Sequence, residues 1–538
     1  MLTRSGSRRR GASGRRRPRL RVLAPALLPA IIVAGGCADD GDEARPSEDD
    51  TPSAVAADGE APADGSGDDG GSGGEDEEVE AQSFVTRPDL SPPVIDVQTA
   101  GQTSPGLLFL APKRGGAQRG ALIVDDEGEV VWARPSEDTV ADFRVQTYQG
   151  KPVLTWFEGK IQGGFGRGEY VIADSAYRDI ARVAAGSDHD GDHHEFRLTD
   201  EGTALITIYN KERVDLSGVG GPQDGWMING YLQEIDIATG EVLLEWSAYD
   251  HVPIAESTGV LVPDAGATDD PSDDDGTEKT PYDWFHINSV AEDGDDGLLV
   301  SARYTDAIYS IDRRTGEVRW TLGGKGSDFA MGEGAEFVRQ HDAQRLSDGT
   351  ISLFDNQAHP PDNRESRGLV LAVDEGEGTA TVVREWRHPD GVRATSQANT
   401  QVLPGGGAVI GWGSVGRVTE FDAGGAVVFD ATWMPGNSYR AYRHEWTGRP
   451  ITSPDAVARP VGGGDGVEVY ASWNGATEVV EWRVLGGPEA GDLEALATVT
   501  KDGFETRVEI DAVAHVAVEA LDASGTVLAT SGTVAVAG

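Results

Sequence analysis

The sequence predicts an all-β protein, in which a six-bladed β-propeller is followed by a small C-terminal β-sandwich. Three observations lead to this fold class. Long stretches of helical periodicity are missing, Gly, Val, Thr and Trp are frequent, and one pattern of short strands and turns recurs six times between residues 106 and 450. Hydrophobic residues make up 38% of the 538 residues, which is enough for a large core and for more than one folded unit.

Residues 1–37 have the composition of a secretion signal with a lipid-attachment site. Residues 1–21 carry nine Arg and no acid, and an apolar run over residues 22–36 follows them. The run contains two prolines and is shorter than the ~20 apolar residues of a membrane span. It ends at Cys37, the single Cys of the chain, where Val33-Ala-Gly-Gly-Cys37 resembles a bacterial lipoprotein box. This segment predicts an extracytoplasmic protein that a lipid at Cys37 anchors to the cell membrane, by an export route (Sec or twin-arginine) that stays open.

Residues 38–92 form a predicted disordered acidic linker. They contain 18 acids against two Arg, with Ala, Gly, Pro and Ser between them, so they cannot bury enough apolar surface to offset chain entropy. A second acidic tract, over residues 264–279, interrupts the repeats. We expect this tract to be a solvated surface loop, and whether it binds calcium stays open.

The repeated unit over residues 93–452, the predicted propeller, consists of two hairpins. The first hairpin has a strand that ends in Asp, a turn with Gly, and a strand that often carries Trp. In three copies Trp lies four or six residues after the turn Gly, and an even offset keeps it on one face of a strand. The six copies are marked by Asp125, Asp174, Asp236, Asp312, Asp374 and Asp422.

The second hairpin of each unit supplies two more strands. Its apolar strands are expected at residues 153–156, 204–208, 298–302, 350–354 and 408–412. Units of four strands, with Asp markers 48 to 76 residues apart, are typical of a β-propeller with loop insertions. A two-layer sandwich is the alternative, but it gives no reason for six similar four-stranded units.

Three histidines occupy the same register of adjacent units. His194, His286 and His341 each lie eight residues before a turn Gly, and the same count reaches Asp142 and Asn399 in two other units. If the units are equivalent, these positions form a ring near the mouth of the central channel. The three imidazoles are then expected to converge.

The residues alone leave two chemistries open for this group. Three imidazoles can hold zinc, which would make the protein a metal-dependent hydrolase. However, Arg303 ends the strand that follows His286, and a guanidinium in the same space is unfavourable beside a divalent cation. The other chemistry is the transfer of an anionic group, in which a neutral imidazole attacks phosphorus or sulfur and N–H donors stabilise the charged oxygens.

Five segments of the chain match a known family. They are Asp283-Trp-Phe-His-Ile-Asn-Ser-Val290, Leu299-Val-Ser-Ala-Arg303, Thr321-Leu-Gly-Gly-Lys325, Gln340-His-Asp-Ala343 and Ser438-Tyr-Arg-Ala-Tyr442. Together they resemble the bacterial arylsulfotransferases, in particular the branch common in actinobacteria and fungi, over roughly residues 105–535. The resemblance implies a six-bladed propeller that moves sulfate from one phenolic ester to another phenol, without a nucleotide donor, a cofactor or a metal.

The resemblance also implies a role for each site residue. His341 matches the histidine that is transiently sulfated. His286, Asn288 and Arg303 match the residues that hold the sulfuryl oxygens, and His194 matches a further active-site histidine. The implied partners are a small phenolic sulfate donor and a phenolic acceptor, and the oligomeric state is unknown.

Residues 453–538 alternate apolar and polar side chains between Gly turns, which predicts the C-terminal β-sandwich, with no catalytic residue. A formal net charge of −46 repels phosphate backbones and argues against nucleic-acid binding. The single Cys excludes a disulfide scaffold and a Cys-rich metal site. An extracytoplasmic propeller that binds aromatic or glycan ligands without sulfuryl transfer is the alternative function.

Overall fold

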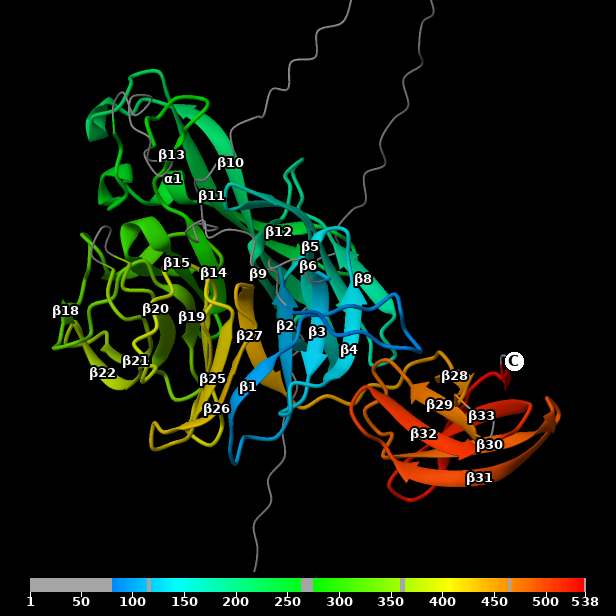
Figure 1. Ribbon diagram of the computed structural model, residues 1–538. Helices are drawn as coiled ribbons and strands as arrows, with labels where there is room; N and C mark the ends of the chain where they lie inside the picture. Colours follow the sequence, from blue (N-terminus) through cyan, green and yellow to red (C-terminus); the bar gives the residue numbers. More distant parts are fainter. Residues whose placement is uncertain (1–79, 114–117, 263–273, 359–362, 463–465, 537–538) are drawn as a thin grey trace, which may run out of the picture. The chain divides into compact units, whose positions relative to one another are not determined.

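The computed structural model describes residues 80–113, 118–262, 274–358, 363–462 and 466–536, and these residues form an all-β fold (Figure 1). Within these ranges the only α-helix is α1 (Ala248–His251), and short 3-10 turns lie at η1 (Ser217–Val219), η2 (Ile254–Glu256) and η4 (Arg303–Thr305). None of the helices described is long and apolar enough to cross a membrane. The predicted signal peptide, the lipoprotein box and most of the predicted linker lie outside the described residues.

The last part of the predicted linker is folded, which corrects its boundary. Residues 80–82 pair with residues 92–94, because the Gln82 N–H donates to the Pro92 carbonyl (2.8 Å) and the Val94 N–H donates to the Glu80 carbonyl (2.7 Å). Leu90 is buried in a hydrophobic cluster of the sheets that follow. The acidic composition of residues 38–92 as a whole concealed the few apolar residues, such as Leu90, near the end of this segment.

The described residues between 96 and 444 form six sheets, each built on four antiparallel strands, and three of the sheets include a fifth strand. Three of the six are β5 (Thr139–Tyr148), β6 (Lys151–Gln162), β7 (Phe165–Ala173) and β8 (Asp179–Val183); β9 (Asp192–Leu198), β10 (Thr203–Val214), β11 (Gly225–Asp236) and β12 (Val242–Ser247); and β14 (Ile287–Glu292), β15 (Gly297–Ala302), β16 (Ala307–Asp312) and β17 (Val318–Gly323). A short strand, β13 (Tyr282–Asp283), pairs in parallel with β11.

The other three sheets include both ends of this region. They are β19 (His341–Arg345), β20 (Ile351–Asp355), β21 (Arg367–Asp374) and β22 (Thr379–Trp386), with β18 (Ala330–Met331) beside β22; β23 (Asn399–Val402), β24 (Ala408–Gly411), β25 (Arg417–Phe421) and β26 (Val427–Thr432), with β1 (Asp96–Ala100) beside β26; and β27 (Ser438–His444), β2 (Leu107–Pro112), β3 (Gly120–Val124) and β4 (Val130–Pro135).

The six sheets form a closed series. The strands β5, β9, β14, β19, β23 and β27 contact one another in this order, and β27 also contacts β5. The closure uses strands from distant parts of the chain, because β27 pairs with β2 and β26 pairs with β1. These six strands, which we call the first strands, therefore bring residues from all six sheets together.

The recurring Asp has a structural role in the turn of each outer hairpin. The Asp125 carboxylate accepts the N–H groups of Glu127 (3.1 Å) and Glu129 (2.9 Å). The Gly128 that follows has a φ of 80°, a left-handed conformation that glycine adopts without strain. The Asp and Gly markers are thus local turn chemistry, which explains why they recur at fixed offsets.

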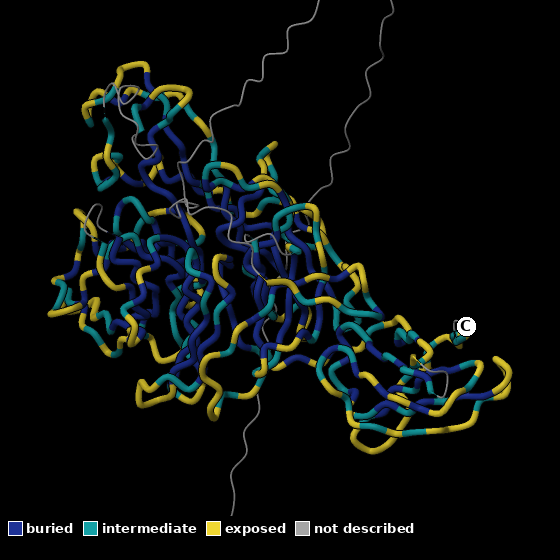
Figure 2. The backbone as a smooth tube through the Cα atoms, in the orientation of Figure 1, coloured by how far each residue is buried: buried dark blue, intermediate teal, exposed yellow. Residues whose placement is uncertain are grey.

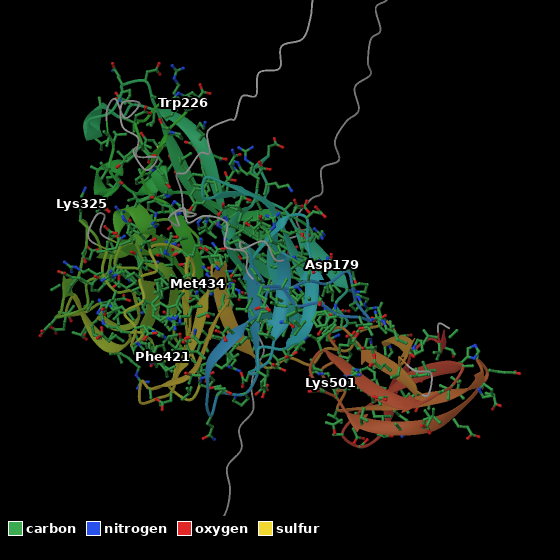
Figure 3. The ribbon with its side chains drawn as sticks, in the orientation of Figure 1. Asp179, Trp226, Lys325, Phe421, Met434 and Lys501 are labelled. Carbon is green, nitrogen blue, oxygen red and sulfur yellow. The ribbon has the colours of Figure 1, made fainter. Side chains whose placement is uncertain are left out.

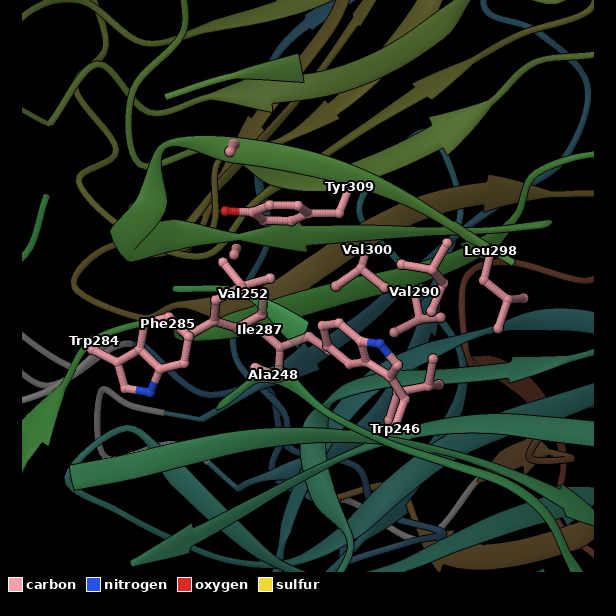
Figure 4. Packing of buried hydrophobic residues seen from close by; sticks show 14 of the residues in the cluster. Trp246, Ala248, Val252, Trp284, Phe285, Ile287, Val290, Leu298, Val300 and Tyr309 are labelled. Carbon is pink, nitrogen blue, oxygen red and sulfur yellow. The ribbon is translucent and has the colours of Figure 1, made fainter. Parts of the chain in front are cut away.

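The recurring Trp packs one sheet on the next. Trp246 on β12 is fully buried in a cluster with residues of β14, β15 and β16, among them Val290 and Tyr309 (Figure 4). Its indole N–H donates to the Gly316 carbonyl of the following sheet (3.0 Å). Removing such a side chain costs about 3–5 kcal/mol. Along the chain, buried residues line the strands and exposed residues gather at the turns (Figure 2).

Residues 455–535 form two further sheets. One contains β28 (Asp455–Pro460), β29 (Gly466–Ser472) and β32 (Glu505–Asp511), and the other contains β31 (Asp492–Thr500), β30 (Glu481–Glu489), β33 (His515–Leu521), β34 (Val527–Thr530) and β35 (Val534–Ala535). In β29 the apolar residues are buried and alternate with half-exposed ones. A separate core forms around Val469, Trp482 and Val516.

Candidate active site

The first strands are irregular at the register that the sequence singled out. The pairing of β5, β9, β14 and β19 with the next strand shifts close to Asp142, His194, Asn288 and His341, respectively. Three residues here have a left-handed backbone without being glycine, namely Asp142 (φ 53°), His286 (φ 54°) and Asp342 (φ 56°). Bulges redirect side chains and are frequent beside active sites. These register shifts and left-handed residues therefore determine which side chains of neighbouring first strands lie close to one another.

His194 and His286 face each other from neighbouring sheets. Their ring centroids are 5.0 Å apart and the rings are nearly perpendicular, at 86°. Each ring has a carboxylate at Nδ1: His286 Nδ1 lies 2.5 Å from Asp283 Oδ2, and His194 Nδ1 is hydrogen-bonded to Asp192 Oδ1. Both rings are buried. With Nδ1 engaged in this way, any chemistry of the two rings is assigned to Nε2.

The structure distinguishes His194 from His193, the residue before it in the sequence. The pKa of His193 falls to about 4, because the side chain is buried and lies beside His194. His193 is therefore neutral at physiological pH. Its ring packs on Phe157 and Tyr439, whereas His194 faces His286.

His341 has a different environment from the other two histidines. Its Nδ1 lies 2.8 Å from Asn356 Oδ1 and 3.1 Å from the Arg339 carbonyl, so both partners are neutral oxygens. The backbone N–H of Gln397 donates to Nε2 (3.2 Å). These contacts place the proton on Nδ1 and the lone pair on Nε2, which is the tautomer of a neutral imidazole.

Asn288 and Arg303 connect these histidines. The Asn288 amide donates to the carbonyl of Gln340, the residue before His341 (2.6 Å). Arg303 begins η4 directly after β15, and its backbone N–H donates to the His286 carbonyl (2.9 Å). These contacts join Asn288 to the residue before His341 and Arg303 to His286.

Aromatic rings line the same site. Tyr209 lies 5.4 Å from His194 and 5.5 Å from His286, measured between ring centroids. Tyr439 lies 5.5 Å from His194, and Tyr304 lies 5.3 Å from His286. The Arg303 guanidinium stacks on Tyr304, with its carbon 4.9 Å from the ring centroid. Such a set of rings suits a ligand with an aromatic part.

Arg440 is the main residue that the sequence analysis missed, although it lies inside the matched segment over residues 438–442. It is fully buried on β27, and its Nη2 donates to the carbonyls of His194 (3.1 Å) and Asn288 (3.2 Å). Its Nη1 donates to Asp142 Oδ1 (3.0 Å), and Nη2 also donates to Glu195 Oε2 (3.2 Å). A single guanidinium thus holds the backbone of two predicted site residues.

The charges around Arg440 are tightly coupled. Burial opposes the ionised form of Glu195, but the guanidiniums of Arg440 and Arg144 hold the pKa of Glu195 at about 2. Burial raises the pKa of Asp142 and of Asp342 instead. The cluster therefore balances its two guanidiniums with one firmly ionised carboxylate and two carboxyls that resist ionisation.

The structure also places three other features of the sequence. Asn399, in the same register as the histidines, exchanges two hydrogen bonds of 2.9 Å with the backbone of Ala441 and so joins β23 to β27. Lys325 of the matched segment lies in the turn after β17 and donates to the carbonyls of Ala255 (3.3 Å) and Ser257 (Figure 3). In the described end of the acidic tract, residues 277–279 are exposed and Asp274 Oδ2 accepts the N–H of Asp283 (2.9 Å).

The described residues offer one group with three metal-ligand atoms. It is Asp192, His193 and His194, whose ligand atoms lie within 4.8 Å of one another. His286 and His341 do not belong to it, so the three-histidine zinc site considered from the sequence is not assembled by these side chains. The Asp192 carboxylate already accepts backbone N–H groups of Gly166 and His194. We therefore interpret Asp192 as a hydrogen-bond acceptor for these backbone groups and for the His194 imidazole.

A protein-family model described as arylsulfotransferase (ASST) matches residues 144–433. The chain belongs to the arylsulfotransferase family. All five predicted site residues lie within the matched range, and Arg440 lies beyond it. No curated protein matches this arylsulfotransferase-family chain.

Solved structures that resemble the chain do so distantly. A protein of unknown function from Bacteroides caccae is 15% identical, with 63% of this chain and 100% of that chain covered and a TM-score of 0.38. Virginiamycin B lyase from Staphylococcus aureus is 8% identical, with 70% and 95% covered and a TM-score of 0.30. Sqt1 from Saccharomyces cerevisiae is 10% identical, with 69% and 79% covered and a TM-score of 0.30. At such scores these likenesses carry no argument about this protein.

Proposed function

We propose that this protein transfers a sulfuryl group from a phenolic sulfate ester to a phenol through a sulfated intermediate on His341. One observation carries the proposal: His194 and His286 face each other with a carboxylate at each Nδ1, whereas the Nδ1 partners of His341 are the neutral oxygens of Asn356 and Arg339. A neutral imidazole has the nucleophilic lone pair that attack on sulfur requires. The family membership supports the same reaction class.

In the first half-reaction, Nε2 of His341 attacks the sulfur in line with the phenolic oxygen. The N–S bond forms as the S–O bond to the phenol breaks, and the electron pair of that bond leaves with the phenolic oxygen. His286 or His194 gives its Nε2 proton to this oxygen, so a neutral phenol departs. In this proposal Arg303 and Asn288 supply N–H donors to the sulfuryl oxygens, a contribution of about 3–4 kcal/mol for one such donor.

The second half-reaction reverses these steps with a different phenol. The imidazole that lost its proton takes the proton of the acceptor hydroxyl, the acceptor oxygen attacks sulfur, and the N–S bond breaks. His341 returns to its neutral form. Since one nucleophile serves both halves, the proposal requires ping-pong kinetics.

The proposal includes the architecture and the location. We assign the six sheets of residues 96–444 to the blades of a six-bladed β-propeller, supported by the closed series of first strands, and the two sheets of residues 455–535 to a β-sandwich. The site would then lie on the propeller axis. A lipid on Cys37 would hold the protein on the outer side of the cell membrane.

The decisive experiment uses the whole protein, a chromogenic phenyl sulfate as donor and a second phenol as acceptor. The wild type should release the donor phenol in an acceptor-dependent way, and quenching with donor alone should add the mass of one SO₃ group to His341. His341→Ala should lose both signals and keep its circular dichroism spectrum. Full activity of His341→Ala, or a strict need for an added divalent metal, would contradict the proposal, and binding without turnover would favour the ligand-binding alternative.

A further inference from the structure

The Nδ1 partners divide the three histidines into two classes. Asp192 and Asp283 are carboxylates that contact His194 and His286, whereas Asn356 presents a neutral amide oxygen to His341. The three carboxylate or amide partners lie at different distances along the chain from their histidines, two residues before His194, three before His286 and fifteen after His341, so the difference does not follow from one repeated structure.

Each carboxylate is itself held in place. Asp192 is fully buried, and its oxygens accept the backbone N–H groups of His194 (3.0 Å) and Gly166. Burial opposes its ionised form, but the two neighbouring imidazoles hold the pKa of Asp192 well below its usual range. It is therefore a fixed negative charge.

Asp283 is held by the segment around it. It lies on β13, which pairs with β11, and the following Trp284 and Phe285 are fully buried (Figure 4). Its backbone N–H donates to Asp274 (2.9 Å). Burial and the neighbouring Asp283 raise the pKa of Asp274 to about 8, so Asp274 is neutral at pH 7.

A carboxylate at Nδ1 has two effects on an imidazole. It fixes the tautomer with the proton on Nδ1, and it stabilises the imidazolium that forms when Nε2 takes a second proton. A neutral amide oxygen fixes the tautomer without favouring the imidazolium. The first environment suits a group that carries a proton, and the second suits a nucleophile that must stay neutral.

We infer that Asp192 and Asp283 are positioning residues that make His194 and His286 the proton carriers of sulfuryl transfer, while Asn356 keeps His341 neutral for attack. This inference rests on the proposed function. It assigns general acid and base catalysis to His194 and His286, the two histidines with carboxylate partners. It predicts that exchanging Asp for Asn, or Asn for Asp, at the three partners impairs the reaction.

The test compares donors with good and poor leaving groups. Asp283→Asn and Asp192→Asn keep size and hydrogen-bonding geometry but remove the charge. A nitrophenolate leaves without help, whereas the phenolate of unsubstituted phenyl sulfate needs a proton. We expect one or both variants to lose about 10²-fold to 10⁴-fold in single-turnover rate with phenyl sulfate, and less than about tenfold with nitrophenyl sulfate.

Asn356→Asp provides the opposite substitution. It places a carboxylate against His341 and should slow formation of the SO₃ adduct with both donors by a similar factor, because it acts on the nucleophile and not on the leaving group. The matched control is Asp430→Asn, which removes a buried acid 3.4 Å from Nε2 of His388 outside the site. It should reduce stability and leave the ratio of the two donor rates unchanged.

The outcomes are distinguishable. Equal losses with both donors in Asp192→Asn and in Asp283→Asn, or no loss in either, would overturn the inference and leave the proposed function standing. A wild type that forms no adduct on His341 would instead refute the proposed function. A donor-dependent loss in Asp430→Asn equal to that in Asp283→Asn would also overturn the inference, because the effect would then come from general loss of buried charge.

Discussion

Replacing Arg440 with Met tests whether the buried guanidinium supports both the fold and the site. In the protein its Nη1 donates to Asp142 (3.0 Å) and its Nη2 donates to Glu195 (3.2 Å), with further bonds of 3.1 and 3.2 Å to the carbonyls of His194 and Asn288. Met has a similar length and no donor. The variant therefore leaves two buried carboxyl groups and two carbonyls without these bonds.

The size of the effect follows from these contacts. Breaking a buried ion pair by removing one partner costs about 3–5 kcal/mol, and a buried acceptor without its donor costs about 1–3 kcal/mol. Arg144 lies 3.1 Å from Asp142 and also pairs with Glu195, so it offsets part of the loss. We expect the free energy of unfolding to fall by about 3–5 kcal/mol. Because His194 and Asn288 lose the bonds that hold their backbone, kcat should fall by about 10²-fold.

Arg443→Met is the matched control for this prediction. Arg443 lies on the same strand, is 2% exposed, and pairs with Glu420 and Asp126 (both 2.7 Å), which are outside the site. Urea unfolding followed by Trp fluorescence, together with kcat measured far below the transition, separates stability from activity. Arg443→Met should lose comparable stability and keep kcat within about twofold. If Arg440→Met loses less than about 1 kcal/mol, or if both variants lose the same kcat, the reasoning is wrong.

Three further predictions test other parts of the structure. Arg303→Ala should lower kcat by about 10²-fold to 10³-fold in steady-state assays, as for the loss of one donor to a developing charge, and a change below threefold would remove Arg303 from that role. Burial and the charge of Asp283 raise the pKa of Asp274 from 3.8 to about 8, so its contribution to stability is complete below about pH 4 and is lost as the pH rises to 8. Asp274→Asn should therefore reduce the fall in melting temperature over this range, and an unchanged slope would contradict the assignment. Cys37→Ser should release the protein from the membrane fraction into the soluble extracytoplasmic fraction, and continued membrane attachment would show that Cys37 is not the anchor.

The sequence predicted the register of the histidines because the hairpins that carry them have constant length. His194, His286 and His341 each precede a turn Gly by eight residues, and turn chemistry fixes that Gly. Register alone did not predict direction. Asn399 shares the register but hydrogen-bonds Ala441. The bulges that redirect side chains in β5, β9, β14 and β19, and the left-handed residues beside them, leave no mark in composition or periodicity.

The partners of the histidines were beyond sequence reasoning for a related reason. Asp192 lies two residues before His194, Asp283 lies three before His286, and Asn356 lies fifteen after His341. No single spacing relates the three pairs, so no repeat analysis could find them. Arg440 was hidden in another way, since the hydrogen-bond and ion-pair partners of its side chain are 98 or more residues away in the sequence and an Arg in a strand is ordinarily a surface residue.

The position of Arg440 makes the site depend on closure of the six sheets. Arg440 lies on β27, which completes its sheet only by pairing with β2, from the opposite end of the region. From there it contacts Asp142 on β5, reaches His194 on β9 and Asn288 on β14 through their carbonyls, and lies 3.7 Å from Asp342 on β19. A chain in which β27 and β2 are apart contains the three histidines but lacks the donor that fixes the backbone of two neighbouring strands. We therefore expect the site to be organised only when the last sheet forms. Arg440 hydrogen-bonds the neighbouring strands and lies on β27, the strand that closes the series.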